Sequence, residues 1–207
     1  KLQKAIRVFG LDLRGAAVLD VGASTGGFTD CALRHGAAFV YAVDVGTNQL
    51  DYRLRTDPRV KSIENTHISR LTPADLDDRV MDFITADLSF ISVRTVVGDL
   101  LAFTGENAKL VILIKPQFEA AKDQVEPGGL VKKIDVHSAI LHDIITVYRK
   151  NGLYLENLAV SPIRGAKGNT EYLALFTRDP AKGNQIDIDR IISPEVNSEV
   201  KNHASHH

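Results

Sequence analysis

The stretch VLDVGASTGGFTD, residues 18–30, decides the fold of this chain. Apolar residues typical of a buried strand lead into an acidic residue and then into a loop of glycine, alanine, serine and threonine. Glycine adopts positive φ angles at no steric cost and leaves the backbone open to close approach. The stretch therefore predicts a strand, a tight loop with another group packed closely against it, and a helix over residues 26–36.

Outward from this stretch, strand-like and helix-like segments alternate. Strands are predicted at residues 16–22, 38–46, 60–66, 81–90, 108–116, 153–163 and 170–178, and further helices at residues 1–10, 92–104 and 135–151. Near-continuous apolar strands that alternate with helices are typical of a mostly parallel sheet covered on both faces. The last two strands have no helix between them, so one strand must run antiparallel. We therefore predict an α/β fold with a mostly parallel seven-stranded sheet.

Size and composition are those of one globular domain. The chain has 207 residues, 44% hydrophobic and 25% charged, with a formal net charge of -1. A charge this close to zero argues against binding nucleic acid through bulk charge alone. The single cysteine, Cys31, fits a reducing compartment, and no apolar run reaches the roughly 18 residues of a membrane helix. We expect a cytoplasmic protein with a polar tail over residues 179–207.

The glycine loop fits two classes of ligand. Ligands of open α/β sheets bind beyond the carboxyl ends of the strands, and the next strand ends in Asp44, whose carboxylate can accept both hydroxyls of a ribose. A dinucleotide needs Gly-x-Gly-x-x-Gly, and residues 22–27 lack the second glycine of that pattern. The amino-acid end of S-adenosylmethionine suits Asp-x-Gly-x-x-x-Gly-Gly, which residues 20–27 provide. A tight turn that binds nothing is the third interpretation.

Three further polar side chains end or begin predicted strands. Asp87 ends the strand in TADLSF, Lys115 ends the strand in ILIKPQF, and Glu171 begins the strand in TEYLALF. Singly, each has an ordinary explanation, since a lysine can cap a strand with its stem on apolar surface. Because Asp87 and Lys115 end neighbouring strands at the edge that carries the glycine loop, they are candidate site residues. The polar segment 116–131 is typical of a functional lid or a disordered loop.

Several segments together resemble the hemolysin-A-like family of FtsJ-like ribose 2′-O-methyltransferases. They are residues 1–46, which include LDVGASTGGFTD, and the motifs ITADLSFIS, LIKPQFE and KGNTEYLALF. The resemblance covers residues 1–178 and implies a Rossmann-like class I methyltransferase fold. It also implies a catalytic tetrad of two lysines and two carboxylates, here Lys1, Asp87, Lys115 and Glu171. Lys4 is the alternative to Lys1.

The same resemblance implies a cofactor and a substrate. The cofactor is S-adenosylmethionine, and its implied binding residues are Asp20, Gly22, Ala23, Ser24, Thr25, Gly26, Gly27, Phe28, Asp44, Asn65 and Asp87. The implied reaction is metal-free methyl transfer to the ribose 2′-hydroxyl of cytidines in ribosomal RNA or ribosomal subunits. Members of the family normally carry an S4-type RNA-binding domain upstream of this segment.

Two other functions stay open on the sequence. The glycine spacing disfavours a nicotinamide-dependent oxidoreductase. The presence of Asp87, Lys115 and Glu171 together disfavours a non-catalytic RNA-binding or hemolysin-like protein. Basic residues in predicted loops are candidates for an RNA surface, although each alone is as readily a solvated charge: Lys122, Lys132, Lys133, Arg164 and Lys167.

Overall fold

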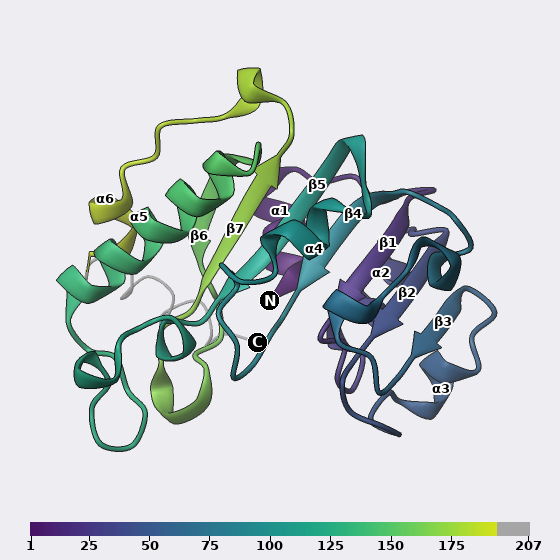
Figure 1. The fold of residues 1–207 in the computed structure, drawn as a ribbon, viewed down its shortest axis with the longest axis horizontal. Coiled ribbons are helices and arrows are strands. Elements are labelled where there is room, and N and C mark those ends of the chain that lie inside the picture. Colours follow the sequence, from purple (N-terminus) through teal and green to yellow (C-terminus); the bar gives the residue numbers. More distant parts are fainter. Residues whose placement is uncertain (194–207) are drawn as a thin grey trace.

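The computed structural model of this chain describes residues 1–193, so the predictions for residues 194–207 lie outside the described part. At its centre is a seven-stranded sheet in the order β3-β2-β1-β4-β5-β7-β6 (Figure 1). The strands are β1 (Ala17–Val21), β2 (Phe39–Val43), β3 (Val60–Ile63), β4 (Met81–Ala86), β5 (Thr104–Ile114), β6 (Tyr154–Val160) and β7 (Tyr172–Thr177).

The strand directions confirm the predicted fold class. β1 pairs in parallel with β2 and β4, β2 with β3, and β4 with β5. Only β7 runs against its neighbours, pairing antiparallel with both β5 and β6. The chain order reverses between β1 and β4, and ligands of open α/β sheets bind at such a reversal. The glycine loop that follows β1 therefore lies at the expected ligand edge.

Helices cover both faces of the sheet and enclose two apolar cores (Figure 1). One face carries α1 (Leu2–Phe9), α2 (Gly27–Arg34) and α3 (Tyr52–Arg55), and the other carries α4 (Val97–Leu101), α5 (Ile134–Lys150) and α6 (Ile188–Ile192). Successive residues of a strand point to opposite faces. In β1, Val18 accordingly belongs to the core beneath α1 and α2, and Leu19 to the core beneath α4 and α5.

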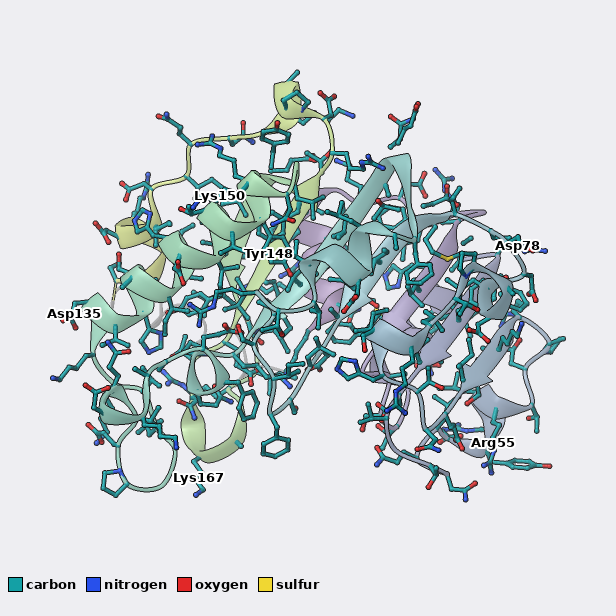
Figure 2. The ribbon with its side chains drawn as sticks, in the orientation of Figure 1. Arg55, Asp78, Asp135, Tyr148, Lys150 and Lys167 are labelled. Atoms are coloured by element: carbon teal, nitrogen blue, oxygen red, sulfur yellow. The ribbon has the colours of Figure 1, made fainter. Side chains whose placement is uncertain are left out.

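The long helix α5 follows from the spacing of its apolar residues. Val136, Ile140 and Ile144 recur every four residues and are buried, which gives the helix one apolar face. The ring of Tyr148 stacks on Phe176 of β7 with 4.4 Å between ring centroids. Figure 2 shows Tyr148 directed from α5 toward the sheet. This packing fixes the helix over β7, the strand that carries the antiparallel pairing.

Several predicted elements differ in extent from the structure; the strand predicted at residues 81–90, for example, ends at Ala86. The helix predicted at residues 92–104 forms only over α4, because Ser92 and Val93 bond instead to the buried carboxylate of Glu119. The strand predicted at residues 108–116 begins earlier, at Thr104, which pairs with Met81 before an irregularity in the register. Short 3₁₀ helices form in the connections at Ile68–Arg70, Pro73–Leu76, Pro116–Phe118, Lys122–Gln124, Ala166–Gly168 and Pro180–Lys182.

The described part of the predicted tail packs on the domain. Ile188 and Ile192 of α6 are buried in the core beneath α5. Ser138 of α5 donates a hydrogen bond from Oγ to Asp189 of α6 at 3.0 Å. The chain therefore continues onto α5 past residue 178, and the domain boundary predicted there stays a prediction.

Candidate active site

The glycine loop is shaped by two close approaches of neighbouring groups. Gly22 has a φ of 79°, and a Cβ there would lie 2.6 Å from the backbone oxygen of Asp87. Gly26 has a φ of 99°, and a Cβ there would lie 2.2 Å from Cδ1 of Leu54. Gly27 differs, because a Cβ there would meet no atom within 4 Å. The first two glycines serve packing, and the third leaves the N-terminus of α2 open.

Asp44, which follows β2, holds the glycine loop in place. Its Oδ2 accepts the backbone N–H of Ser24 at 2.8 Å, and its Oδ1 accepts the N–H of Gly46 at 2.7 Å. Ser24 has a left-handed φ of 48°, so this hydrogen bond supports an unfavourable backbone conformation. Each carboxylate oxygen keeps a further lone pair for a ligand.

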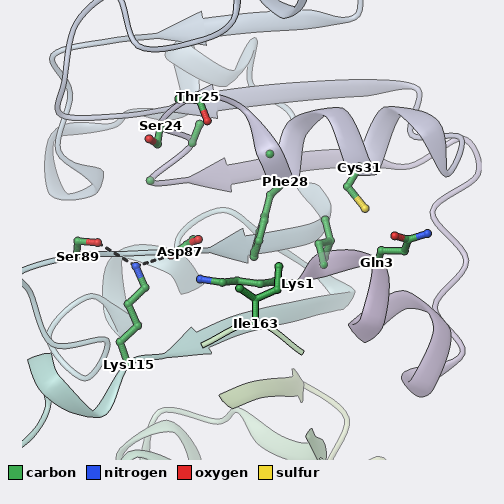
Figure 3. A pocket seen from close by; sticks show the side chains of 14 residues that line it. Lys1, Gln3, Ser24, Thr25, Phe28, Cys31, Asp87, Ser89, Lys115 and Ile163 are labelled. Atoms are coloured by element: carbon green, nitrogen blue, oxygen red, sulfur yellow. Dashed lines mark hydrogen bonds and ion pairs between the residues drawn. The ribbon is translucent and has the colours of Figure 1, made fainter. Parts of the chain in front are cut away.

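Two cavities lie along the loop and meet at its middle. One, of about 490 Å³, is bordered by Lys1, Phe28 and Lys115 (Figure 3). The other, of about 460 Å³, is bordered by Asp44 and by residues 66–68. Both are lined by the same four residues at their junction, Gly22, Ser24, Asp87 and Ser89. The pair of cavities offers space for a ligand with a nucleoside end and an amino-acid end.

Two lysine–carboxylate pairs stand at the first of these cavities, which is lined by Lys1, Asp87 and Lys115, while Glu171 lies behind Lys1 and lines neither cavity. Lys115 Nζ, after β5, lies 2.6 Å from Asp87 Oδ1, after β4, and donates a hydrogen bond to Ser89 Oγ at 2.9 Å. Lys1 Nζ, before α1, donates to Glu171 Oε2, before β7, at 2.7 Å. Figure 3 shows the amines of Lys1 and Lys115 directed toward the same space. Four separate elements thus bring the predicted tetrad together, whereas Lys4 lines neither cavity.

Glu171 is enclosed by the loop that precedes it. Its side chain is 2% exposed, and a Cβ at Gly165 would lie 2.0 Å from Glu171 Oε1. Only a residue without a side chain fits there unless the carboxylate moves. Burying a carboxylate is costly unless it is paired with a cation. The ion pair with Lys1 is therefore what allows the carboxylate of Glu171 to be buried.

The polar segment 116–131, predicted as a lid or a disordered loop, is ordered and fastened at its end. His137 is buried, which lowers its pKa, and its neutral ring donates from Nε2 to the carbonyl of Val131 and accepts from the hydroxyl of Tyr172. The side-chain oxygen of Asn169 accepts the N–H of Val131 at 3.0 Å. These bonds join the segment to the strand that begins beside Glu171.

An aromatic side chain is held out at the rim of the site. Phe90 is 91% exposed and has a φ of 65°, which is strained for a bulky residue. Its ring lies 5.0 Å from that of Phe118, between centroids. The amine of Lys115 lies 5.9 Å from the centroid of Phe118. The two rings therefore border Lys115 on the solvent side.

Three predicted cofactor residues do not line either cavity. Asp20 is buried beneath the loop, where its carboxylate accepts hydrogen bonds from the hydroxyls of Thr29 and Thr85. Burial raises the pKa of Asp20 to about 6, against the opposing effect of these two hydrogen bonds. Gly26 packs on α3, and Asn65 is exposed. The remaining predicted cofactor residues border at least one cavity: Gly22, Ala23, Ser24, Thr25, Gly27, Phe28, Asp44 and Asp87.

Among the residues that the sequence did not predict are Ser89, which lines both cavities, and Glu119, which lines neither but supports the segments beside them. Ser89 contacts Lys115, and its position two residues after Asp87 was the available signal. Glu119 ends the quoted motif LIKPQFE; its buried carboxylate accepts from Ser92 Oγ and from the N–H of Val93 at 2.8 Å. This carboxylate ties the segment after Asp87 to the segment after Lys115.

The predicted basic residues are exposed on loops: Lys122, Lys132, Lys133, Arg164 and Lys167. Figure 2 shows Lys167 at the tip of the loop between β6 and β7. Lys132 pairs with Glu126 at 2.6 Å. Within residues 1–193, no group of three or more histidines, cysteines or carboxylates is arranged to hold a metal ion. In the same part of the chain, no helix is long and apolar enough to span a bilayer.

Comparison with known proteins gives one family and several named relatives. A family model described as FtsJ-like methyltransferase matches residues 1–178. Hemolysin A of Brachyspira hyodysenteriae is 44% identical over 176 residues, which cover 85% of this chain and 73% of that protein. A Mycobacterium tuberculosis protein named 16S/23S rRNA (cytidine-2′-O)-methyltransferase TlyA is 41% identical over 198 residues, covering 93% of this chain and 74% of that protein.

Solved structures agree with these matches. A Streptococcus thermophilus protein named as a hemolysin superposes with a TM-score of 0.92 at 36% identity, covering 100% of this chain and 75% of that chain. A Listeria monocytogenes protein named as an S-adenosylmethionine-dependent methyltransferase superposes with a TM-score of 0.62 at 15% identity, covering 86% of this chain and 100% of its own. The second likeness concerns the fold alone.

Proposed function

Because this chain belongs to the FtsJ-like methyltransferase family, we propose that it transfers a methyl group from S-adenosylmethionine to the ribose 2′-hydroxyl of cytidines in ribosomal RNA. The observation that carries the proposal is the convergence of two ion pairs, Lys115–Asp87 and Lys1–Glu171, at a cavity beside the glycine loop. The ribosomal and cytidine parts rest on the relative named TlyA. A cytoplasmic location belongs to the same proposal.

The residues present fit S-adenosylmethionine. Asp44 keeps carboxylate lone pairs for ribose hydroxyls beyond those it gives to Ser24 and Gly46. The N-terminus of α2 has no side-chain cap and is open at Gly27, so its N–H groups can receive a carboxylate. Asp87, at the junction of the cavities, provides negative charge for a sulfonium. When bound, S-adenosylmethionine supplies an electrophilic methyl carbon on a good leaving group.

The charged side chains would act on the acceptor hydroxyl. Holding the attacking oxygen in line with the methyl group can supply up to roughly 7–11 kcal/mol of the barrier. Lys115 would act in one of two ways: as a neutral amine that takes the hydroxyl proton, or as a cation that stabilises the developing alkoxide. Asp87 would hold Lys115 in either case. Glu171 would hold Lys1, whose charge lies beside that of Lys115.

Features at the rim suit an RNA substrate. Exposed aromatic rings provide faces on which unstacked bases can lie, and Phe90 is such a ring beside Lys115. The exposed lysines and arginines of residues 122–133 and 164–167 could contact phosphates. A ribose hydroxyl carries no base identity, so selection of the nucleotide must come from such surrounding contacts.

The geometry gives less support to the other functions considered. A dinucleotide site would use the glycines of the loop for a pyrophosphate. Here the space at Gly26 is filled by Leu54, and the space at Gly22 is filled by the backbone of Asp87. One relative is named Hemolysin A. A purely lytic or RNA-binding function would not require two lysine–carboxylate pairs at one cavity.

The test is transfer of a deuterated methyl group from labelled S-adenosylmethionine to ribosomal RNA that lacks this modification. Nucleoside mass spectrometry should find labelled 2′-O-methylcytidine with the wild-type chain and none with Lys115→Ala. Cofactor binding without any labelled ribose, or a label on a base instead of a ribose, contradicts the proposal.

A further inference from the structure

The amine of Lys115 has an ion-pair partner within the predicted tetrad and a hydrogen-bond acceptor outside it. Asp87 Oδ1 lies 2.6 Å from Lys115 Nζ, and Ser89 Oγ accepts a hydrogen bond from Nζ at 2.9 Å (Figure 3). An ammonium group has three N–H donors in a tetrahedral arrangement. Because Ser89 holds one of these N–H groups, it restricts rotation about Cε–Nζ and sets the directions of the other two positions.

Burial does not explain the placement of Ser89. The residue is exposed and stands at the junction of the two cavities. The following residue, Phe90, has a φ of 65°, although its side chain is almost fully exposed. A left-handed conformation costs free energy for a bulky residue and persists where the surroundings impose it. The strained turn keeps Ser89 beside Lys115, and within residues 1–193 the only aromatic ring contact of Phe90 is with Phe118, which lies beside the same lysine.

We propose that Ser89 is a positioning residue for Lys115: by accepting one N–H of the amine, it directs another position of the amine toward the 2′-oxygen of the bound ribose. The identity of the acceptor rests on the proposed function. The contact between Ser89 and Lys115 is a property of this chain alone.

The hydrogen bond to Ser89 restricts the direction of proton exchange. Ser89 accepts one N–H of Lys115, and Asp87 is the ion-pair partner on another side of the amine. When Lys115 is neutral, its lone pair can take the remaining position, which faces the cavity. A proton lost by the 2′-hydroxyl then reaches Lys115 from the cavity, as the O–H bond breaks and an N–H bond forms.

The charged groups that face Lys115 come from three elements. Asp87 follows β4, and Lys1 precedes α1 and is paired with Glu171 at the start of β7. Ser89 is uncharged, so its removal changes none of these charges. A variant of Ser89 therefore tests the hydrogen bond separately from the tetrad.

The contact can be tested without RNA or cofactor. Acetic anhydride reacts with neutral amines only, and mass spectrometry reads the labelling of each lysine across pH. Ser89→Ala removes an acceptor that stabilises the charged amine, so the labelling midpoint of Lys115 should move to lower pH by roughly half to one unit. Ser89→Thr keeps a hydroxyl and should keep the wild-type midpoint. Ser138→Ala, which loses a serine hydrogen bond between α5 and α6, is the matched control.

Methyl transfer provides the second readout. Under single-turnover conditions, Ser89→Ala should lower the rate about tenfold, and Ser89→Thr should restore it. The cofactor dissociation constant should change by less than about twofold. The limb of the pH–rate profile that belongs to Lys115 should move to lower pH, in the same direction as the labelling midpoint.

The outcomes separate the two proposals. A Ser89→Ala protein whose labelling midpoint matches that of the wild type overturns the role of Ser89. A lower rate also overturns the role of Ser89 if neither the labelling curve of Lys115 nor the pH–rate profile moves along the pH axis. A purely structural effect lowers the rate by the same factor at every pH. If the wild-type chain transfers no methyl group to ribosomal RNA, the proposed function is contradicted instead. The acetylation curves of Lys115 then still show whether Ser89 contacts its amine.

Discussion

The two halves of the proposed site differ in how the chain assembles them. The proposed cofactor half comes from adjoining segments: Asp44 bonds to Ser24, 20 residues earlier in the sequence. The proposed catalytic half comes from distant segments: Lys1 pairs with Glu171 across 170 residues, and Lys115 and Asp87 follow neighbouring strands. The first half is built around β1, α2 and β2, whereas the second requires α1, β4, β5 and β7 to come together. Substitutions in the first half should weaken cofactor binding, and substitutions in the second should stop methyl transfer.

The largest effect should follow the loss of Lys115. Lys115→Ala should lower the single-turnover rate of methyl transfer by about a thousandfold or more, because the other amine at this cavity, that of Lys1, is held by Glu171. The cofactor dissociation constant, measured by calorimetry, should stay within about twofold. Lys109→Ala, on the same strand, loses an ion pair with Glu156 and should keep the rate. Near-normal turnover by Lys115→Ala would remove this lysine from the mechanism.

The second prediction separates stability from chemistry in the distant ion pair. Lys1→Met leaves the buried carboxylate of Glu171 unpaired and should lower the free energy of unfolding by about 3 kcal/mol. The double variant Lys1→Met/Glu171→Gln removes that charge and should recover most of the stability but not the activity. Denaturant unfolding and methyl transfer are measured on each. Recovery of activity in the double variant would show that the pair is structural only.

The third prediction concerns pH and the support beneath the glycine loop. Burial raises the pKa of Asp20 to about 6, above its ordinary value of 3.8. Between these values the folded state binds the proton more tightly than the unfolded chain, so Asp20 destabilises the fold increasingly as pH rises from about 4 to 6, and by a constant amount above that. Relative to wild type, Asp20→Asn should therefore gain up to about 3 kcal/mol of unfolding free energy between pH 4 and 7. A difference that does not change with pH would contradict this.

The smallest effect is expected on cofactor affinity. Asp44→Ala should weaken binding of S-adenosylmethionine by about 1–3 kcal/mol through the loss of charge-assisted hydrogen bonds. Asp57→Ala, in an exposed turn where Asp57 pairs with Arg59, should bind as the wild type does. At saturating cofactor, Asp44→Ala should lose far less rate than Lys115→Ala. Equal losses would erase the distinction between the two halves.

The sequence was sufficient for features that depend on neighbouring residues. Apolar strands and the glycine loop predicted the sheet, and parallel strands predicted that Asp87 and Lys115 would end at one edge. The pairing of Lys1 with Glu171 could be expected only from the family resemblance, because nothing local links two residues so far apart. The same alternation that places Val18 under α2 also turns Asp20 toward α2, so its burial was available from the strand period.

Other features depended on contacts that no local pattern encodes. The carboxylate of Glu119 interrupts the predicted helix at Ser92 and Val93, and this requires the loops after β4 and β5 to meet. The contact of Ser89 with Lys115 depends on the left-handed backbone conformation of Phe90, which the sequence DLSF does not predict. Such residues become visible only when side-chain directions are known.

The proposed methyl transfer is tested most directly by a mass-spectrometric map of ribose methylation in ribosomal RNA from cells with the gene, without it, and with Lys115→Ala in its place. We expect at least one 2′-O-methylcytidine that is present with the wild-type gene and missing in both of the other strains. Identical maps in all three strains would contradict the proposed function.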